Sequence, residues 1–166
     1  MSPEEVIIKT FIFENLDEQE VAAILKITKE KRFSKGEIIM QEGHEGDTMY
    51  IVVNGSVEVS KTLTMKVGEE RTEREKILRR FQAEDNVVFG EMAMIDRGNR
   101  SASAASSTDC TLLEIKRADF LDLIEKRPQT GVKILRRIAE LLASRVRQSS
   151  QDVIRLTTAL SIALSS

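Results

Sequence analysis

The sequence predicts an α+β fold that is mainly β, with helices before and after a central run of strands. Between Lys31 and about Thr64, β-branched and apolar residues alternate with glycines, which is typical of short strands joined by tight turns. Strand-like patterns return at residues 77–89 and 109–115. The segments on either side of these strands carry helical periodicity instead, which places the helices at the two ends of the chain.

The chain has 166 residues, the usual size of one domain. Its composition is 41% hydrophobic and 31% charged, with eight glycines and two prolines, which indicates a folded globular protein. We expect one domain over residues 1–166, with an N-terminal helical segment at 1–30, a β-region at 31–115 and C-terminal helices at 116–164.

Charge and cysteine content exclude several classes of function. A net charge of -2 and a pI near 5.6 disfavour DNA binding by this chain alone. The single cysteine, Cys110, cannot form an internal disulfide or a cysteine-rich metal site, so no metal or cofactor is expected. The acidic N-terminus and the lack of a long apolar run predict a soluble cytoplasmic protein that does not contact membranes.

Turn and cap residues predict the local elements. Asp17 is placed to cap a short amphipathic helix at residues 17–28. The pair Asn54-Gly55 favours a two-residue turn, which would make the strands within residues 49–59 antiparallel partners. The charged stretch 66–76 is interpreted as a solvated hairpin tip or a mobile connection.

The C-terminal region is predicted to form two helices, because Arg127-Pro128 should end one and begin another. The second helix carries a heptad pattern formed by Leu142, Val146, Ser149, Val153, Leu156, Leu160 and Ala163. A helix of roughly 30 residues reaches about 45 Å, more than one small domain can cover. The pattern therefore predicts a dimerisation helix; the alternative is an amphipathic helix that lies on its own domain.

Residues 89–102 carry the binding chemistry. Gly90 permits a sharp exit from a strand, and one helical turn from Glu91 through Ile95, which includes Met92 and Ala93, can direct free amides at an anion. Nine residues after Glu91, the guanidinium of Arg100 can hold phosphate oxygens. A carboxylate beside a phosphate needs a hydrogen-bond donor to face, and a ribose hydroxyl is such a group. The sequence thus predicts a ribose phosphate site; the alternative for the two charged residues is a surface ion pair.

Small residues follow the arginine. Ser101 offers one further hydroxyl donor, and Ala102 lets a ligand approach the backbone closely. Arg79 and Arg80 are adjacent on a predicted strand and point to opposite faces, so only one could reach the site, and both are interpreted as solvated.

The segment Phe89-Gly90-Glu91-Met92-Ala93-Met94, followed by Arg100-Ser101-Ala102, resembles the phosphate-binding cassette of the cyclic-nucleotide-binding domain family of CRP/FNR-like proteins. The glycine pattern at Gly36, Gly43, Gly46 and Gly55 is similar to the same family. The resemblance covers roughly residues 10–160. It implies a double-stranded β-helix, that is, a jelly-roll-like β-roll, in which Glu91 binds the ribose hydroxyl and Arg100 binds the cyclic phosphate.

The resemblance also implies that the long helix closes over the base. Ser149 and Ser150 look like a hydroxyl pair that bacterial members place against adenine; alternatively, the two serines fix the register of the heptad seam. Departures from the family pattern are Asn99, His44 and the long charged connection. The chain also ends soon after the predicted dimer helix, which leaves no room for the helix-turn-helix domain of related transcription factors.

Three classes of function follow from this reading. The leading hypothesis is a dimeric sensor without catalysis, which binds cyclic AMP and signals through its long helix to a separate protein partner. The second is a dimerisation scaffold without a ligand, or one that answers to cyclic GMP or cyclic di-GMP. The third, a phosphodiesterase, lacks the metal ligands or base that it would need.

Overall fold

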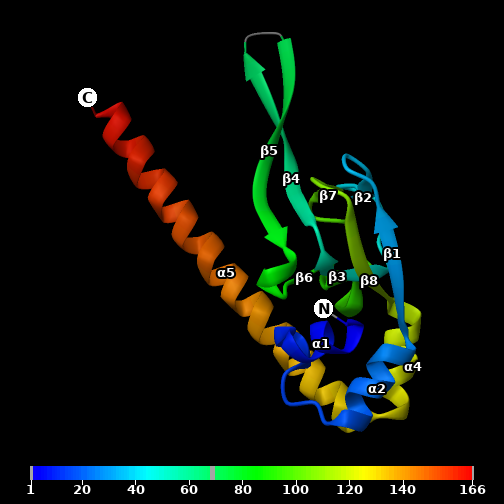
Figure 1. Ribbon diagram of the computed structural model, residues 1–166. Helices are drawn as coiled ribbons and strands as arrows, with labels where there is room; N and C mark the ends of the chain where they lie inside the picture. The colour runs from blue at the N-terminus through cyan, green and yellow to red at the C-terminus, as the bar shows by residue number, and fades with distance from the viewer. Residues whose placement is uncertain (1, 68–69, 166) are drawn as a thin grey trace.

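The computed structural model describes residues 2–67 and 70–165 and contains two four-stranded sheets, which confirms the predicted mainly β fold (Figure 1). The first sheet has the strand order β1 (Thr28–Phe33), β8 (Cys110–Lys116), β3 (Thr48–Asn54) and β6 (Val88–Phe89). The second has the order β2 (Ile38–Met40), β7 (Ser103–Ser106), β4 (Ser56–Val67) and β5 (Glu70–Gln82). Every strand pair within these sheets is antiparallel.

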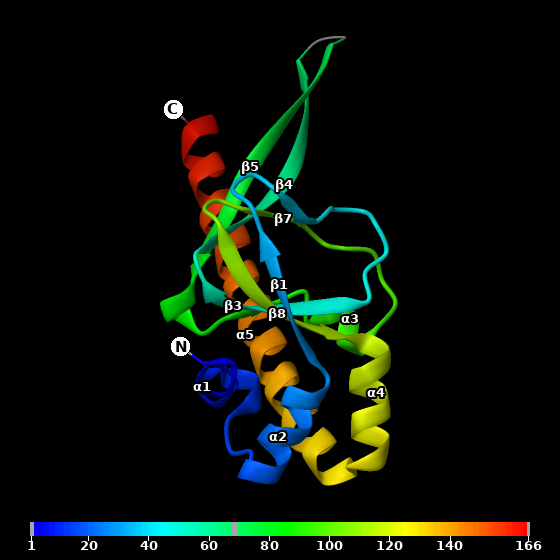
Figure 2. The same cartoon turned by 45° about the vertical axis from the view of Figure 1, so that its right-hand side comes forward.

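The helices gather at one end of the strands (Figure 1, Figure 2). The N-terminal segment forms α1 (Pro3–Lys9), a 3-10 turn η1 (Phe11–Phe13) and α2 (Glu18–Lys26). Between strands lie η2 (Ala83–Asp85) and the single turn α3 (Met92–Ile95), and the chain finishes with α4 (Arg117–Lys126) and α5 (Pro128–Leu164). Asp17 caps α2 as predicted, because its carboxylate accepts from the Glu20 amide. A capping box at Ser2 forms α1, which the sequence analysis did not single out.

Two apolar clusters share the central strands. On β3, Met49 and Ile51 face the helices, whereas Tyr50 and Val52 face the second sheet. Both faces of the strand are therefore buried, and its side chains read as an uninterrupted apolar run instead of an alternating one. Cys110 belongs to the cluster between the sheets, where it is 4% exposed, so it is a core residue.

The predicted hairpin across Asn54-Gly55 is wrong. β3 pairs with β8 and β6, whereas β4 pairs with β5 and β7 in the other sheet. Only Gly55 has a positive φ, of 81°, whereas a type I′ turn requires one at both central residues. The chain instead passes from one sheet to the other at this point, and a Cβ on Gly55 would lie 2.4 Å from the Asp109 carbonyl oxygen.

The charged stretch 66–76 belongs to the long antiparallel hairpin of β4 and β5, which extends away from the rest of the domain (Figure 1, Figure 2). This agrees with the hairpin-tip interpretation over the described strands. The tip itself, residues 68–69, lies outside the described residues.

The long helix α5 begins at Pro128, where the break between two helices was predicted, and runs for 37 residues. Its buried positions, Thr130, Gly131, Ile134 and Ile138, all lie near its beginning. From Val146 onward every described residue of α5 is exposed, and this part extends away from the body of the two sheets (Figure 1). The alternative of a helix lying along its own domain is therefore wrong for the second half of α5.

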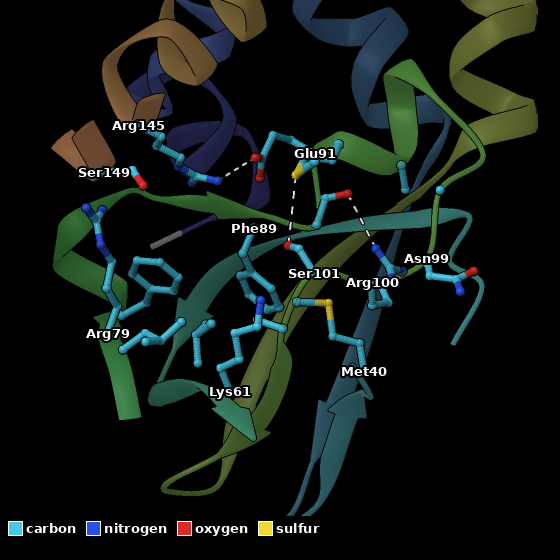
Figure 3. A pocket seen from close by; sticks show the side chains of 18 of the residues that line it. Met40, Lys61, Arg79, Phe89, Glu91, Asn99, Arg100, Ser101, Arg145 and Ser149 are labelled. Atoms are coloured by element: carbon cyan, nitrogen blue, oxygen red, sulfur yellow. Dashed lines mark hydrogen bonds and ion pairs between the residues drawn. The ribbon is translucent and has the colours of Figure 1, made fainter. Parts of the chain in front are cut away.

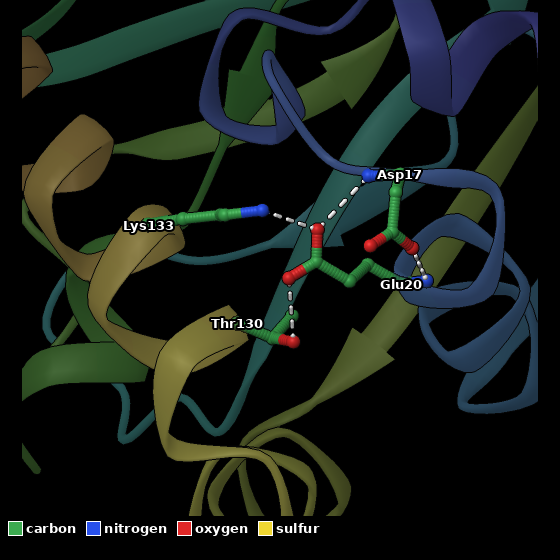
Figure 4. Close-up of polar contacts among 4 residues, drawn as sticks. All are labelled: Asp17, Glu20, Thr130 and Lys133. Carbon is green, nitrogen blue, oxygen red and sulfur yellow. Dashed lines mark hydrogen bonds and ion pairs between the residues drawn. The ribbon is translucent and has the colours of Figure 1, made fainter.

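A buried carboxylate fixes the beginning of α5 against α2 (Figure 4). Glu20 is 7% exposed and accepts hydrogen bonds from Thr130 Oγ1 at 2.9 Å, Lys133 Nζ at 2.6 Å and the Asp17 amide at 2.9 Å. Burial alone would raise the pKa of Glu20, but these donors together hold it below its ordinary value. The first turns of α5 are thus attached to the N-terminal helices by a charge-assisted network.

No helix within the described residues combines the length and the apolar character needed to cross a bilayer.

Candidate functional site

A cavity of about 440 Å³ lies between the second sheet, the segment 89–102 and the middle of α5 (Figure 3). The segment 89–102 forms its central wall: β6 ends at Phe89, Gly90 turns the chain with a φ of 75°, and α3 follows. A Cβ on Gly90 would lie 2.9 Å from both Arg100 Nη1 and the Thr48 carbonyl oxygen. Glycine is therefore required here for the close approach of the arginine as well as for the turn.

The Arg100 guanidinium is held by neighbouring strand ends. Its Nη1 donates to the Thr48 carbonyl oxygen at 2.7 Å, and its Nη2 donates to Thr48 Oγ1 at 2.7 Å. Its stem covers Gly46, where a Cβ would lie only 2.0 Å from Arg100 Nε. Burial lowers the pKa of this guanidinium, opposed by the charges of Tyr50, Asp47 and Glu91, but an arginine remains protonated at neutral pH.

The loop that carries Arg100 is tied to the chain before β3 by backbone hydrogen bonds. The Arg100 amide donates to the His44 carbonyl oxygen at 2.8 Å, and the Gly43 amide donates to the Arg100 carbonyl oxygen at 2.9 Å. Asn99 forms an isolated β-bridge with Glu45. The two residues that depart from the family pattern, His44 and Asn99, therefore contribute backbone to this loop, which sets the position of the arginine.

Glu91 is almost fully buried, with 1% of its surface exposed, yet it lines the cavity. Its Oε1 accepts a short hydrogen bond from Arg145 Nη1 of α5, and Arg145 Nη2 donates to the Val88 carbonyl oxygen at 3.3 Å (Figure 3). Its Oε2 is buried and has no hydrogen-bond partner among the described residues. Burial raises the pKa of Glu91, against the charges of Arg145 and Arg100, which lower it.

The alternative of a surface ion pair between Glu91 and Arg100 is wrong. Glu91 is buried, and its ion-pair partner in the described structure is Arg145. Arg100 instead donates to backbone and hydroxyl oxygens. Both residues therefore line the same cavity without forming an ion pair with each other.

The amides of the turn are partly engaged. The Ala93 amide donates to the Gly90 carbonyl oxygen at 3.2 Å, and the Met94 amide donates to the Glu91 carbonyl oxygen at 3.0 Å. Ala93 thus lines the cavity without a free amide, contrary to the predicted cradle of free donors. Only the amides at the beginning of the turn, those of Glu91 and Met92, donate to no backbone carbonyl within the described residues.

The cavity brings together eight of the nine predicted site residues: Gly90, Glu91, Met92, Ala93, Arg100, Ser101, Ala102 and Ser149. Ser101 Oγ donates weakly to Met92 Sδ at 3.9 Å. Ser150 does not line the cavity; it is exposed, and its hydroxyl donates to the Val146 carbonyl oxygen at 3.0 Å within α5. Neighbours on a helix point about 100° apart, and of these two serines only Ser149 faces the cavity of this protomer.

Sequence reasoning missed several lining residues. Lys61 of β4, Arg79 of β5, and Arg145, Gln148 and Asp152 of α5 also face the cavity. The signal available on α5 was helical spacing. Positions 145 and 152 lie four and three residues from the predicted Ser149 and therefore share its face of the helix. Arg79 was interpreted as solvated; it is exposed but lines the cavity, whereas Arg80 pairs with Glu58 at 2.7 Å.

Two antiparallel sheets, a cassette that faces a cavity and a long helix across its mouth define a cyclic-nucleotide-binding β-roll. A family model described as "Cyclic nucleotide-binding domain" matches residues 30–127. The chain belongs to this family, as a CRP/FNR-like cyclic nucleotide-binding domain, which confirms the resemblance of the cassette and the predicted β-roll.

Two relatives are similar in sequence over most of the chain. The cyclic AMP receptor protein of Thermus thermophilus is 31% identical over 142 residues, which cover 86% of this chain and 60% of that protein. A CRP-like cAMP-activated global transcriptional regulator of Mycobacterium tuberculosis is 27% identical over 151 residues, covering 90% and 61%. The chain therefore spans about three fifths of the length of these relatives.

Solved structures match the fold as well. The catabolite activator protein of Thermus thermophilus superimposes with a TM-score of 0.73 at 30% identity, covering 89% of this chain and 63% of that one. A cyclic nucleotide-binding domain from Methylobacillus flagellatus superimposes with a TM-score of 0.72 at 25% identity, covering 90% and 79%. The protein therefore contains a regulatory type of cyclic nucleotide-binding domain.

Proposed function

We propose that this domain is a cyclic AMP sensor that binds the nucleotide in the cavity beside α5 and signals through that helix as a homodimer. It carries out no catalysis in this role. The domain functions in the cytoplasm and signals to a separate protein partner. In this proposal it contacts neither DNA nor a membrane itself.

The unpartnered Oε2 of Glu91 carries the proposal. A buried carboxylate oxygen without a donor is costly, so its presence in a cavity calls for a partner from the ligand. Oε1 is already occupied by Arg145. Glu91 lines the cavity, so we place the sugar there: a shift of the carboxylate would expose this buried oxygen to a ribose 2′-hydroxyl, which would supply the missing donor.

The phosphate belongs at Arg100. Arg100 and the next residue, Ser101, both line the cavity, so the guanidinium donors that Thr48 and Gly90 leave free can serve one phosphate oxygen and the Ser101 hydroxyl a second. Glu91 and Met92 also line the cavity, and we propose that the amide of Met92, which donates to no backbone carbonyl among the described residues, is available to the phosphate. A singly charged cyclic phosphodiester fits this set because it presents anionic oxygens and no further charge to compensate.

Cyclic AMP is favoured over the other candidates by the two relatives whose names include it and by Ser149, which lies at the end of the cavity away from Arg100 (Figure 3). Ser150 would have to be reached from a second copy of the chain, or it serves only α5. Cyclic GMP remains the second candidate ligand, because Ser101 can also serve a guanine nucleotide. A ligand-free scaffold would leave Glu91 Oε2 without its donor.

The dimer is proposed from the exposed face of α5. Val146, Val153, Leu156 and Leu160 follow the heptad spacing and are each about 60–70% exposed. A second copy packed along this seam would bury them. Arg145 lies on the same helix and contacts Glu91. A ligand bound at Glu91 would therefore act on the helix that also forms the dimer seam.

Calorimetry with cyclic AMP tests the binding proposal. Replacing Arg100→Ala should weaken binding about tenfold to a hundredfold or more, because a charged hydrogen-bonding group is lost at the phosphate. Arg97→Ala is the matched control: it removes the same charge from the same loop at an exposed residue that does not line the cavity.

An Arg100→Ala affinity equal to that of the wild type would refute the site. A thermal-shift panel with cyclic AMP, cyclic GMP and cyclic di-GMP separates the ligand candidates, since a specific ligand must stabilise the folded state. If none of the three raises the melting temperature, the scaffold hypothesis takes precedence.

A further inference from the structure

The end of the cavity opposite Arg100 holds a second group of polar side chains. Figure 3 shows Arg100 on one side, Ser149 and Arg79 on the other, and Glu91 between them. Gln148 and Asp152 of α5 line the same cavity. Because a nucleotide joins its phosphate, sugar and base in that order, a ligand with its phosphate at Arg100 and its sugar at Glu91 directs its base toward this end. This step rests on the proposed function.

Gln148 and Asp152 form a hydrogen-bonded pair one helical turn apart. Gln148 Nε2 donates to Asp152 Oδ1 at 3.1 Å, and Arg155 Nη1 lies 3.7 Å from the same oxygen. A carboxylate only accepts hydrogen bonds, so the amide must present its NH₂ group to Asp152. The orientation of the Gln148 amide is thereby fixed, and its Oε1 is turned away from the carboxylate as an acceptor.

We propose that this Gln148–Asp152 pair determines base specificity, by offering two acceptors that select the 6-amino group of adenine over the 6-oxo group of guanine. The acceptors are Gln148 Oε1 and Asp152 Oδ2. The adenine amino group has two hydrogens and can donate to both. Guanine would place O6, itself an acceptor, against these oxygens.

Guanine has one favourable alternative, which the pair blocks. Its N1–H and N2–H could donate to both oxygens of one carboxylate, as a fork. In this structure Oδ1 of Asp152 is already engaged by Gln148 and lies near Arg155. Guanine must therefore share Oδ1 with Gln148 to bind in this way, which weakens its fork, whereas adenine can use Oδ2 and leave the pair intact. Arg79 can donate to N7, which both purines carry, and so serves either base.

The expected effects are moderate because the pair is partly solvated; the Asp152 side chain is 53% exposed. Wild-type protein should bind cyclic AMP more tightly than cyclic GMP, and more tightly than the cyclic phosphate of purine riboside, which carries hydrogen in place of the amino group. Each hydrogen bond lost should weaken cyclic AMP binding about threefold to tenfold.

Calorimetric titration of these three nucleotides against two variants and a control tests the inference. Asp152→Ala should weaken cyclic AMP about threefold to tenfold and remove most of its advantage over the purine riboside nucleotide. Gln148→Ala should free both Asp152 oxygens and tighten cyclic GMP, so the preference for cyclic AMP should fall about tenfold. Arg147→Ala should leave the preference unchanged, because Arg147 is an exposed residue of the same helix that does not line the cavity.

The outcomes separate this inference from the proposed function. If Arg100→Ala abolishes binding but neither Asp152→Ala nor Gln148→Ala changes the preference, the base is read elsewhere and only the inference fails. A wild-type preference for cyclic GMP would likewise overturn it. If Arg100→Ala leaves all affinities unchanged, or the wild type binds none of the nucleotides, the proposed function fails. Circular dichroism of each variant establishes that it is folded.

Discussion

The ion pair between Arg145 and Glu91 gives the sharpest stability prediction. In Arg145→Ala, Glu91 loses its cationic partner while it remains 1% exposed. Removing one member of a buried pair costs about 3–5 kcal/mol, because an uncompensated charge is left behind. Since the Arg145 side chain is 31% exposed, we expect the lower end, about 3 kcal/mol at pH 7.5.

The destabilisation caused by Arg145→Ala should depend on pH. Burial already raises the pKa of Glu91, and loss of Arg145, whose charge lowers it, must raise it further. An acid with a raised folded-state pKa is most favourable to folding below its unfolded pKa, and this contribution is lost as the pH rises through the folded value. The penalty of Arg145→Ala should therefore shrink as the pH falls and Glu91 becomes protonated.

The assay is thermal and urea unfolding at pH 7.5 and pH 5.0, at one protein concentration. A loss of about 3 kcal/mol corresponds to roughly 6–12 °C in a chain of this size. Arg147→Ala, which removes the same charge from an exposed position nearby on α5, should change the melting temperature little. Equal losses at both pH values, or a loss no larger than that of Arg147→Ala, would refute the reasoning.

Two further predictions concern the two ends of α5. Glu20→Gln should destabilise the protein by about 1.5–3 kcal/mol at neutral pH, because charge-assisted bonds to Lys133 and Thr130 are weakened. Since the pKa of Glu20 is lowered in the fold, this difference should be full above pH 5 and should close as the pH falls through that pKa; urea titration at several pH values checks it. Leu156→Glu should convert the proposed dimer to a monomer in light scattering, whereas Ile154→Glu, equally exposed but off the heptad seam, should not; matching behaviour of the two variants would argue against the seam.

The cassette was predictable because its chemistry is local. Gly90, Glu91 and Arg100 lie within eleven residues. The glycine permits the turn, and the carboxylate and the guanidinium suit the sugar and the phosphate of the ligand, so one short segment shows the whole pattern. The break at Pro128 was predictable for a similar reason, since proline removes a backbone donor and excludes the residue before it from the helix.

What failed depended on pairing between distant segments. Asn54-Gly55 has the composition of a hairpin turn, but β3 is buried on both faces and takes β8 as its partner, more than fifty residues away along the chain. The free energy gained by a favourable two-residue turn is small compared with the free energy gained by burying a whole strand. The ion pair of Arg145 was missed because its partner, Glu91, lies 54 residues earlier, and helical spacing beside Ser149 places Arg145 on the cavity face without revealing that partner.

The anchoring of α5 at one end makes the helix a lever. Its fulcrum is the attachment to Glu20 near Thr130, and Arg145 lies about 22 Å further along, at a rise of 1.5 Å per residue. The end of the helix at Leu164 lies about 51 Å from the same fulcrum. A rigid rotation that shifts Arg145 by about 1 Å would therefore carry the tip by rather more than 2 Å, so a small adjustment beside the bound sugar would be amplified where a downstream protein could sense it.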